Sequence, residues 1–239
     1  MKKRLDVLLV ERGLAESRSQ AQALVLAGLV KGHSKAGEQL EESAELELER
    51  GPSFVSRGGE KLAGALDELR LDVTGERCLD VGASTGGFTD CLLQAGAAHV
   101  VALDVGYGQL HPRLRADPRV TVLERVNVRE LRCADLPFAP TFVTCDVSFV
   151  GVAKALPPAL ACAAPGWRAL VLVKPQFEAG PADVGKGGVV RDPEVRRRVV
   201  DDVAARVPGW GGQVVAVAES ALLGPKGNRE VFLYLAQAA

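Results

Sequence analysis

The chain has 239 residues, of which 47% are hydrophobic and 25% are charged, and its formal net charge is −1. This length and composition predict a soluble globular protein with one α/β domain and a small additional unit. Because the charges nearly balance, a nucleic-acid-binding surface has to be a local basic patch. No apolar run approaches the roughly 20 residues of a membrane-spanning helix, and the N-terminus lacks a signal-peptide stretch, so we expect a cytoplasmic protein without a membrane partner.

The cysteines and histidines give little sign of disulfide or metal chemistry. No Cys-x-x-Cys pair occurs, and four of the five cysteines lie within or beside apolar runs, as small buried side chains do in a reducing compartment. We therefore expect free thiols. The three histidines do not pair at metal-ligand spacing, so no metal site is expected. The cysteines are Cys78, Cys91, Cys133, Cys145 and Cys162.

Residues 1–50 have the pattern of a separate small unit. Apolar residues at helical spacing predict a first helix that ends at Gly13 and a second helix that Ser17 caps. Residues 1–35 carry seven basic and three acidic side chains, whereas residues 38–49 carry six glutamates. The basic surplus suits contact with phosphate, and the glutamates then have to face away from a nucleic acid.

Two short strands are expected next, at 30–33 and 46–49, on either side of a turn at 35–37. A glycine and a proline then break the pattern. We therefore expect an interdomain linker over 51–55 and a second domain over 56–239.

From about residue 75 onward, apolar runs alternate with helical patterns, which predicts βαβ units and a mostly parallel sheet. The last two strands are joined by a loop rather than by a helix. Strands are expected at 77–82, 98–104, 119–124, 141–146, 167–174, 212–219 and 230–236, and helices at 87–96, 109–116, 150–163 and 192–207.

The segment from Cys78 to Thr89 is the most informative one. An apolar strand passes through a turn of small residues directly into a helix pattern, and its glycines let the backbone approach a ligand closely. The spacing is neither that of a dinucleotide-binding turn nor that of a phosphate loop. Asp80 lies just before the turn, where we expect its carboxylate to face a cationic ligand group. Tight strand–helix packing is the simpler alternative.

This turn resembles the cofactor turn of S-adenosylmethionine (SAM) methyltransferases. The resemblance implies a cofactor site made by Asp80, Gly82, Ala83, Ser84, Gly86, Gly87 and Phe88.

Polar residues also stand where the predicted strands end, and ligands bind at the carboxyl ends of strands in open parallel sheets. Asp104 ends the second strand, eighteen residues beyond Gly86, where an acid would hydrogen-bond the ribose hydroxyls of SAM. Asp146 and Lys174 end the fourth and fifth strands, and Glu230 opens the last one. An antiparallel last strand begins where its parallel neighbours end, so these three side chains can converge.

Lys61 completes this group, because Lys61, Asp146, Lys174 and Glu230 together match the Lys-Asp-Lys-Glu set of FtsJ-like ribose methyltransferases. The N-terminal unit resembles the αL module, a small RNA-binding fold of a ribosomal protein, and the whole chain resembles the TlyA family of ribosomal RNA 2′-O-methyltransferases. The motifs are Arg4-Leu5-Asp6, Ser17-Arg18-Ser19-Gln20-Ala21, Ser56-Arg57-Gly58-Gly59-Glu60-Lys61-Leu62, Cys145-Asp146-Val147-Ser148-Phe149, Val173-Lys174-Pro175-Gln176-Phe177-Glu178 and Gly227-Asn228-Arg229-Glu230.

The resemblance implies a fold and an activity. The fold would be a Rossmann-like α/β methyltransferase domain with a seven-stranded, mostly parallel sheet whose last strand is antiparallel beside the fifth, preceded by a small α+β RNA-binding domain. The activity would be SAM-dependent methylation of a cytidine ribose in ribosomal RNA or ribosomal subunits. Lys174 would activate the hydroxyl and Asn127 would contact the adenine of SAM. RNA contacts are expected from Lys3, Arg4, Arg18, Lys31 and Arg57.

Three other functions compete with this one. TlyA relatives have carried a haemolysin label, but the sequence has no span, no secretion signal and no long amphipathic helix with a broad apolar face. Pseudouridine synthases also carry αL modules but need no SAM turn. A methyltransferase acting on a base or a small molecule would share the cofactor turn but would have no use for the Lys-Asp-Lys-Glu set.

Overall fold

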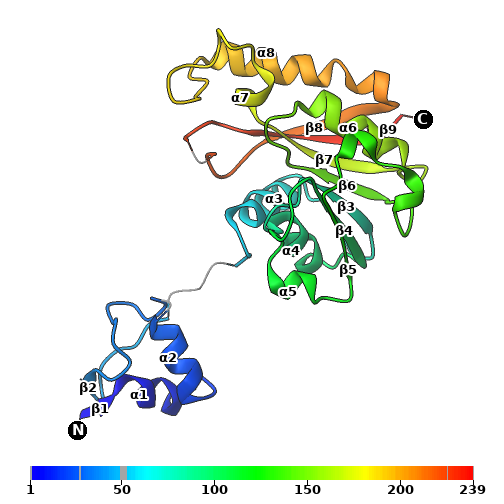
Figure 1. Ribbon diagram of the computed structural model, residues 1–239. Helices are drawn as coiled ribbons and strands as arrows, with labels where there is room; N and C mark the ends of the chain where they lie inside the picture. The colour runs from blue at the N-terminus through cyan, green and yellow to red at the C-terminus, as the bar shows by residue number, and fades with distance from the viewer. Residues whose placement is uncertain (1, 27, 49–52, 225, 239) are drawn as a thin grey trace. The chain divides into compact units, whose positions relative to one another are not determined.

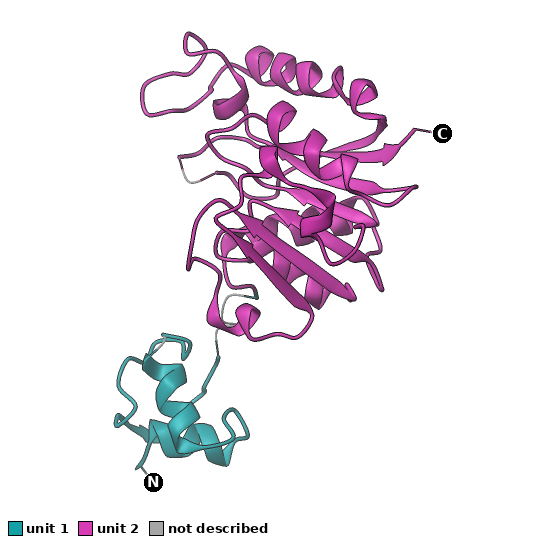
Figure 2. Cartoon of the chain, turned by 45° about the vertical axis from the view of Figure 1, so that its right-hand side comes forward, with its two compact units in different colours: residues 1–53 teal, residues 54–239 magenta. Residues whose placement is uncertain are grey.

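The computed structural model describes residues 2–26, 28–48, 53–224 and 226–238. The chain forms two compact units, residues 1–53 and 54–239, each with its own hydrophobic core (Figure 1, Figure 2). Residues 51 and 52 of the expected linker lie outside the described residues, as does residue 49 of an expected strand.

The first unit consists of strand β1 (Lys2–Arg4), helix α1 (Leu5–Glu11), helix α2 (Arg18–Leu26) and strand β2 (Gln39–Glu41). Both predicted helices are confirmed. The chain turns at Gly13 with φ +70°, and the Ser17 hydroxyl accepts from the Gln20 N–H at 3.2 Å. The core is formed by Leu5, Leu9, Ala15, Ala21, Val25 and Val30.

The prediction of two strands at 30–33 and 46–49 is wrong. The described part of 46–49 pairs with 30–33 through one bridge, Val30 to Leu48, whereas the sheet joins β1 to β2. The alternating leucines of 46–48 pack against the core instead of forming a ladder. Strand β1 is a run of basic residues with no alternation, so the sequence pattern does not reveal it.

The second unit is built on one seven-stranded sheet, in the order β5-β4-β3-β6-β7-β9-β8. All neighbouring strands are parallel except that β9 runs antiparallel between β7 and β8. The predicted α/β Rossmann-like methyltransferase sheet is thus confirmed, with the last strand beside the fifth. The strands are β3 (Arg77–Val81), β4 (His99–Asp104), β5 (Val120–Glu124), β6 (Phe142–Cys145), β7 (Arg168–Val173), β8 (Gly212–Glu219) and β9 (Val231–Gln237).

Helices cover both faces of this sheet (Figure 1). Apolar residues of α3 (Arg57–Glu68), α4 (Gly87–Gln94) and α5 (Pro112–Arg115) pack on one face. Those of α6 (Val152–Ala161) and α8 (Pro193–Ala204) pack on the other face, and α7 (Pro175–Glu178) lies against α8. The short 3₁₀ helices are η1 (Val128–Glu130), η2 (Cys133–Asp135) and η3 (Val207–Trp210).

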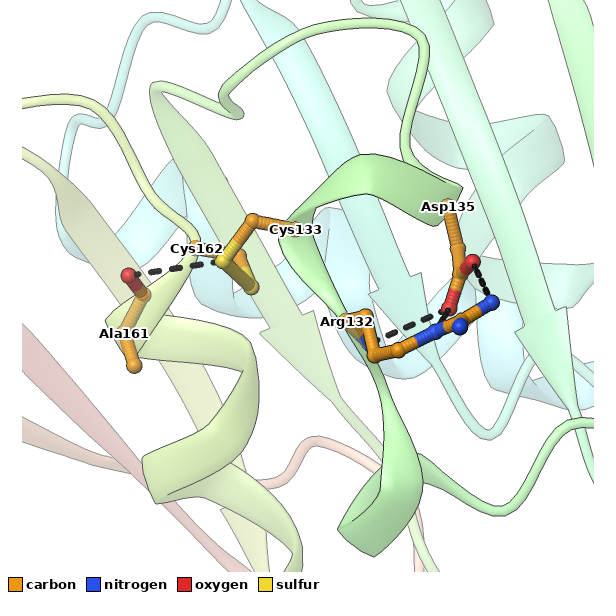
Figure 3. The surroundings of a disulfide bond; sticks show 5 residues. All are labelled: Arg132, Cys133, Asp135, Ala161 and Cys162. Carbon is orange, nitrogen blue, oxygen red and sulfur yellow. Dashed lines mark hydrogen bonds and ion pairs between the residues drawn. A yellow bond between two sulfur atoms is a disulfide. The ribbon is translucent and has the colours of Figure 1, made fainter.

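The expectation that all cysteines are free thiols is wrong for one pair. Cys133 in η2 and Cys162 after α6 form a disulfide with a Cα–Cα distance of 4.9 Å (Figure 3). The fold brings the two residues together across 29 positions of sequence, a separation that no short motif reveals. Cys78, Cys91 and Cys145 are buried free thiols, as expected.

None of the helices in the described residues has the length and apolarity that crossing a membrane requires.

Candidate active site

A cavity of about 770 Å³ opens where the parallel strands end. The turn after β3, the segments after β6 and β7, the start of β9 and the first turns of α3 all contribute to it. Its lining includes Ser56, Arg57, Gly58, Lys61, Gly82, Ala83, Ser84, Gly87, Phe88, Asp146, Ser148, Phe149, Lys174, Gln176, Phe177, Lys226, Asn228 and Glu230.

The four residues of the expected catalytic set line this cavity as two ion pairs. Lys61 Nζ lies 2.5 Å from Glu230 Oε2, and the two side chains are only 9% and 1% exposed. Lys174 Nζ lies 2.5 Å from Asp146 Oδ1, with 12% and 20% exposure. Lys174 also donates to Ser148 Oγ at 3.1 Å. Removing such pairs from water costs free energy, so their presence in one cavity favours a functional explanation over a structural one.

Helix α3 brings Lys61 to the cavity because its first turn packs directly on the first turn of α4. A Cβ at Gly87 would collide with Ser56 Oγ and lie 2.8 Å from the Gly59 nitrogen. A Cβ at Gly59 would likewise lie 2.9 Å from the Gly87 carbonyl oxygen. The two helices therefore touch through their backbones, and Lys61 follows within the same turn of α3.

The turn after β3 has a backbone that only small residues tolerate easily. Gly82 and Gly86 have φ values of +85° and +95°, and Ser84 also has a positive φ of +48°. A Cβ on Gly82 would lie 2.6 Å from the Asp146 carbonyl oxygen, so the turn can approach the β6 segment. Gly86 faces Leu110 and Leu114 and does not line the cavity.

The structure places Asp80 beneath this turn, and the expectation that its carboxylate faces a ligand is not met. The side chain is fully buried and accepts hydrogen bonds from Thr89 Oγ1 at 2.7 Å and Thr144 Oγ1 at 3.0 Å. Burial raises the pKa of Asp80 to about 7. Asp80 therefore ties the turn to α4 and β6 from below.

Asp104 and Asn127 lie at neighbouring strand ends but outside the cavity lining. The Asp104 carboxylate accepts from the Ser84 N–H at 2.8 Å and the Gly106 N–H at 2.6 Å, which links the ends of β3 and β4. Asn127 caps η1 by accepting from the Arg129 N–H at 3.1 Å. Asp104 is thus joined to a cavity residue, Ser84, whereas Asn127 serves a local turn.

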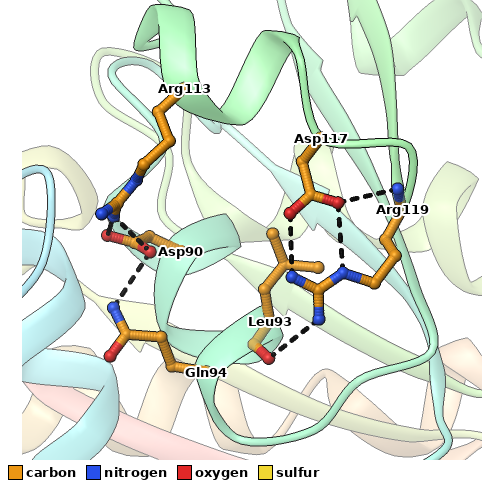
Figure 4. A network of polar contacts seen from close by, with 6 residues as sticks. All are labelled: Asp90, Leu93, Gln94, Arg113, Asp117 and Arg119. Carbon is orange, nitrogen blue, oxygen red and sulfur yellow. Dashed lines mark hydrogen bonds and ion pairs between the residues drawn. The ribbon is translucent and has the colours of Figure 1, made fainter.

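A second network of polar contacts joins α4 to neighbouring segments, and Figure 4 shows the part of it around Asp90 and Leu93. The buried Asp90 carboxylate receives Arg113 at 2.8 and 2.9 Å and Gln94 at 3.0 Å. It also accepts from the Val55 N–H at 2.8 Å. Near the end of α4, the carbonyl oxygen of Leu93 accepts a hydrogen bond at 3.5 Å from Arg119, the residue before β5. These contacts hold α4, and with it the glycine turn, in place.

The five residues expected to bind RNA lie in both units. Arg57 lines the cavity and donates to the Leu223 carbonyl oxygen at 2.8 Å. The other four belong to the first unit and pair with carboxylates while keeping part of their surface exposed. Lys3 pairs with Glu11 and Glu42, Arg4 and Arg18 both pair with the fully buried Asp6, and Lys31 pairs with Glu47.

The sequence reasoning does not reveal two residues that stand beside Lys174. Ser148 accepts its hydrogen bond, and Phe149 is 92% exposed with a φ of +69°. The Phe149 ring lies 5.3 Å from that of Phe177, which in turn lies 6.0 Å from Lys174 Nζ. A serine and an aromatic residue three and four positions after the end of β6 are the signal that points to them.

The cavity fits a nucleoside cofactor by its shape and by its polar groups. The turn offers a wall without bulky side chains, next to the Ser84 hydroxyl and the Asp104 carboxylate, groups that suit a ribose. The carboxylates of the two ion pairs line the same cavity. Among the described residues, no group of three histidine, cysteine or acidic side chains is arranged to hold a metal ion.

Comparison with known proteins agrees with this geometry. Residues 54–237 match the FtsJ-like methyltransferase family and residues 3–31 match the S4 domain. The chain is 48% identical to the 16S/23S rRNA (cytidine-2′-O)-methyltransferase TlyA of Mycobacterium tuberculosis, over 97% of this chain and 89% of that protein. It is 39% identical to Hemolysin A of Brachyspira hyodysenteriae, over 95% and 97% of the two chains.

A solved structure of a hemolysin-named protein from Streptococcus thermophilus superposes with a TM-score of 0.77 at 40% identity, covering 99% of this chain and 89% of the other. The predicted resemblance is thereby confirmed for both units. The chain is an enzyme of the FtsJ-like methyltransferase family and belongs to its TlyA group, in which an S4 domain precedes the methyltransferase domain.

Proposed function

We propose that this protein transfers a methyl group from SAM to the 2′-hydroxyl of a cytidine in ribosomal RNA. The observation that carries the proposal is the presence of two lysine–carboxylate ion pairs, one buried and one partly buried, in one cavity with the glycine turn. The 48% identity to a relative named as an rRNA cytidine-2′-O-methyltransferase supports the substrate. Such a substrate implies a cytoplasmic enzyme.

The cofactor would lie against the turn after β3. Gly82, Ala83, Ser84, Gly87 and Phe88 line the cavity there and are the proposed contacts, with Asp104 beside Ser84 for the ribose. When bound, SAM supplies an electrophilic methyl group that needs no further activation by the protein. The protein's own task is therefore to place and activate the acceptor oxygen.

Lys174 is the proposed activating group. A ribose hydroxyl is a poor nucleophile near neutral pH and needs a base within hydrogen-bond reach. Lys174 accepts the hydroxyl proton as the oxygen attacks the methyl group, and Asp146, 2.5 Å away, holds the resulting ammonium. The second pair, Lys61 with Glu230, keeps another ammonium and carboxylate fixed in the same cavity.

An exposed aromatic ring, that of Phe149, completes the site. The Phe149 ring is 92% exposed at the cavity and faces Phe177 at 5.3 Å. Base stacking on an aromatic side chain is worth about 1–3 kcal/mol. We therefore propose that Phe149 holds the target base out of its stack, which leaves the ribose beside Lys174.

The test is the position of the methyl group on the product. Ribosomal subunits from cells that lack this gene are incubated with SAM and the protein, and the RNA is hydrolysed in alkali. The phosphodiester 3′ to the target should stay intact, because a methylated 2′-oxygen cannot attack it. Mass spectrometry of the resistant dinucleotides then identifies the base and assigns it to small- or large-subunit RNA.

The variant Lys174→Ala tests the proposed base. It should lower single-turnover methyl transfer by ~100- to 10,000-fold, as expected for loss of a base, while calorimetric SAM affinity stays nearly unchanged. A modified nucleotide that hydrolyses normally, or a Lys174→Ala variant with the wild-type rate, would refute the proposal.

A further inference from the structure

Glu178 ends the Val-Lys-Pro-Gln-Phe-Glu motif, yet nothing in the reaction above uses it. Its side chain reaches the start of α6 rather than the cavity. Oε1 accepts from the Val152 N–H at 2.6 Å, the first amide of that helix. Oε2 lies against Gly151, where a Cβ would be only 2.9 Å away. The carboxylate thus occupies space that the absence of a side chain at Gly151 leaves open.

The segment that Glu178 holds carries three cavity residues. Residues 146–152 leave β6 at Asp146, continue through Ser148 and Phe149, and enter α6. The segment is strained, because Phe149 has a φ of +69°, a backbone region that bulky residues rarely occupy. Such a conformation persists only where the surroundings fix it from several sides.

Two neighbouring segments provide this fixation. At one end of 146–152, Lys174 binds Asp146 at 2.5 Å and Ser148 at 3.1 Å. At the other end, Glu178 binds the Val152 N–H at 2.6 Å. Lys174 is the N-cap residue of the short helix α7 and Glu178 is its last residue, so one turn of helix sets the place of both ends.

The position of Glu178 is costly for a carboxylate. Burial raises its pKa, and the hydrogen bond from Val152 and the charge of Arg206 offset this only in part. A carboxylate at a helix N-terminus is favourable in itself, but many exposed caps provide that without burial. Because an ordinary cap needs no burial, the partial burial of Glu178 indicates that its carboxylate is needed at this particular place.

We propose that Glu178 is a positioning residue for methyl transfer: its carboxylate fixes residues 146–152 and so sets Ser148 and Phe149 relative to Lys174. This proposal rests on the proposed function, because Phe149 and Lys174 are assigned there to the target nucleotide. Glu178 itself touches neither substrate nor cofactor.

The experiment compares Glu178→Ala with Glu178→Gln in the full-length protein. The alanine loses the acceptor for the Val152 N–H, whereas glutamine keeps one. Glu178→Ala should lower the single-turnover rate on ribosomal subunits by about 10- to 100-fold, since displacement by about 1 Å can cost that much. Glu178→Gln should restore the rate to within about threefold, and SAM affinity should stay within about twofold in both, because the turn after β3 is unchanged.

Asp192→Ala is the matched control. Asp192 caps α8 by accepting from the Glu194 N–H at 2.8 Å, so its loss also removes a capping carboxylate, but α8 contributes no residue to the cavity lining. This variant should lose similar thermal stability and keep the wild-type rate. If Glu178→Ala keeps the wild-type rate, or Gln fails to restore it, Glu178 does not position the segment.

Gly151→Ala tests the same contact from the other side. Its backbone angles suit alanine, so the main consequence is displacement of the Glu178 carboxylate. The rate should fall as in Glu178→Ala, and in a Glu178→Ala background the Gly151 change should add little. If the rate losses of Glu178→Ala and Gly151→Ala were fully additive, the proposal would be contradicted. Absence of methylation by the wild-type protein would instead refute the proposed function, so the two failures are distinguishable.

Discussion

Burial raises the pKa of Asp80 to about 7, although the hydroxyls of Thr89 and Thr144 donate to its carboxylate and oppose the shift. The ordinary value for an aspartate is near 3.8. The folded protein therefore keeps the Asp80 proton over a pH range in which the unfolded chain has lost it. Because the folded state binds more protons there, its stability falls as the pH rises from about 4 to 7.

The prediction at this scale is that Asp80→Asn removes this pH dependence. Asparagine retains an acceptor and a donor for the two threonines but cannot ionise. The free energy of unfolding of the variant relative to wild type should rise between pH 5 and pH 7 and level off above it. Urea unfolding at pH 5, 6, 7 and 8 measures this difference.

Asp72→Asn serves as the control. Hydrogen bonds from the Thr74 side chain and from the Thr74 N–H lower the pKa of Asp72, so its carboxylate is ionised in both states throughout that range. Its stability difference from wild type should be flat with pH. A flat difference for Asp80→Asn as well would show that Asp80 is already ionised in the fold.

At the scale of elements, the sheet of the second unit could be predicted from the sequence, to within one residue at each strand end. Its strands are apolar, mostly buried runs, and such runs leave a clear pattern. Helix α3 could not be predicted, because Gly58 and Gly59 are poor helix formers and lie in its first turn. Its position depends on backbone contact with α4, which the sequence alone does not contain.

The same distinction applies to the site. Asp146, Lys174 and Glu230 converge because strand ends meet at one edge, which periodicity and topology predict. The places of Ser148 and Phe149, and the contact of Glu178 with Val152, depend on the conformation of the loop after β6, and a positive φ at a phenylalanine has no sequence signature.

The prediction for elements concerns the contact between α3 and α4. Gly59→Ala should raise helix propensity by about 1 kcal/mol, yet the new Cβ would collide with the Phe54 side chain and approach the Gly87 carbonyl oxygen at 2.9 Å. Overpacking of this kind costs about 1–3 kcal/mol. We expect a net loss of about 1 kcal/mol, a Tm lower by about 2–4 °C, and weaker SAM binding because α4 carries the end of the glycine turn.

Gly64→Ala, on the same helix, provides the comparison. Its Cβ would meet only the Cβ of the exposed Ala221, at 3.2 Å, so the propensity gain should prevail and the Tm should not fall. Calorimetry and SAM titration on both variants measure the effects. Equal behaviour of the two alanines would mean that the glycine contact does not position α3.

At the scale of the whole molecule, the proposed function assigns chemistry to the second unit and substrate capture to the first. Every residue of the cavity lining lies between positions 56 and 230, and so belongs to the second unit. Four of the five expected RNA contacts belong to the first unit, which has its own core. Because Lys3, Arg4, Arg18 and Lys31 already pair with carboxylates, binding phosphate means sharing or replacing these partners.

The prediction is that a fragment beginning at Ser53 folds and binds SAM but methylates ribosomal RNA poorly. Phe54 and Val55 stay in the fragment because they pack on the core of the second unit. SAM affinity should match that of the full chain. Each phosphate contact contributes about 0.9 to the salt slope of nucleic-acid binding, so losing the four cations should flatten that slope by about 2–4.

Arg197→Gln in the full chain separates this effect from a general loss of positive charge. Arg197 is exposed on α8 and pairs with Glu194, outside the cavity and outside the first unit. Its removal should leave the salt slope and the methylation rate unchanged. Because the first unit is proposed to hold the RNA while the second performs the transfer, high RNA concentration should recover part of the fragment's rate. Full activity of the fragment at low RNA concentration would show that the second unit binds its substrate alone.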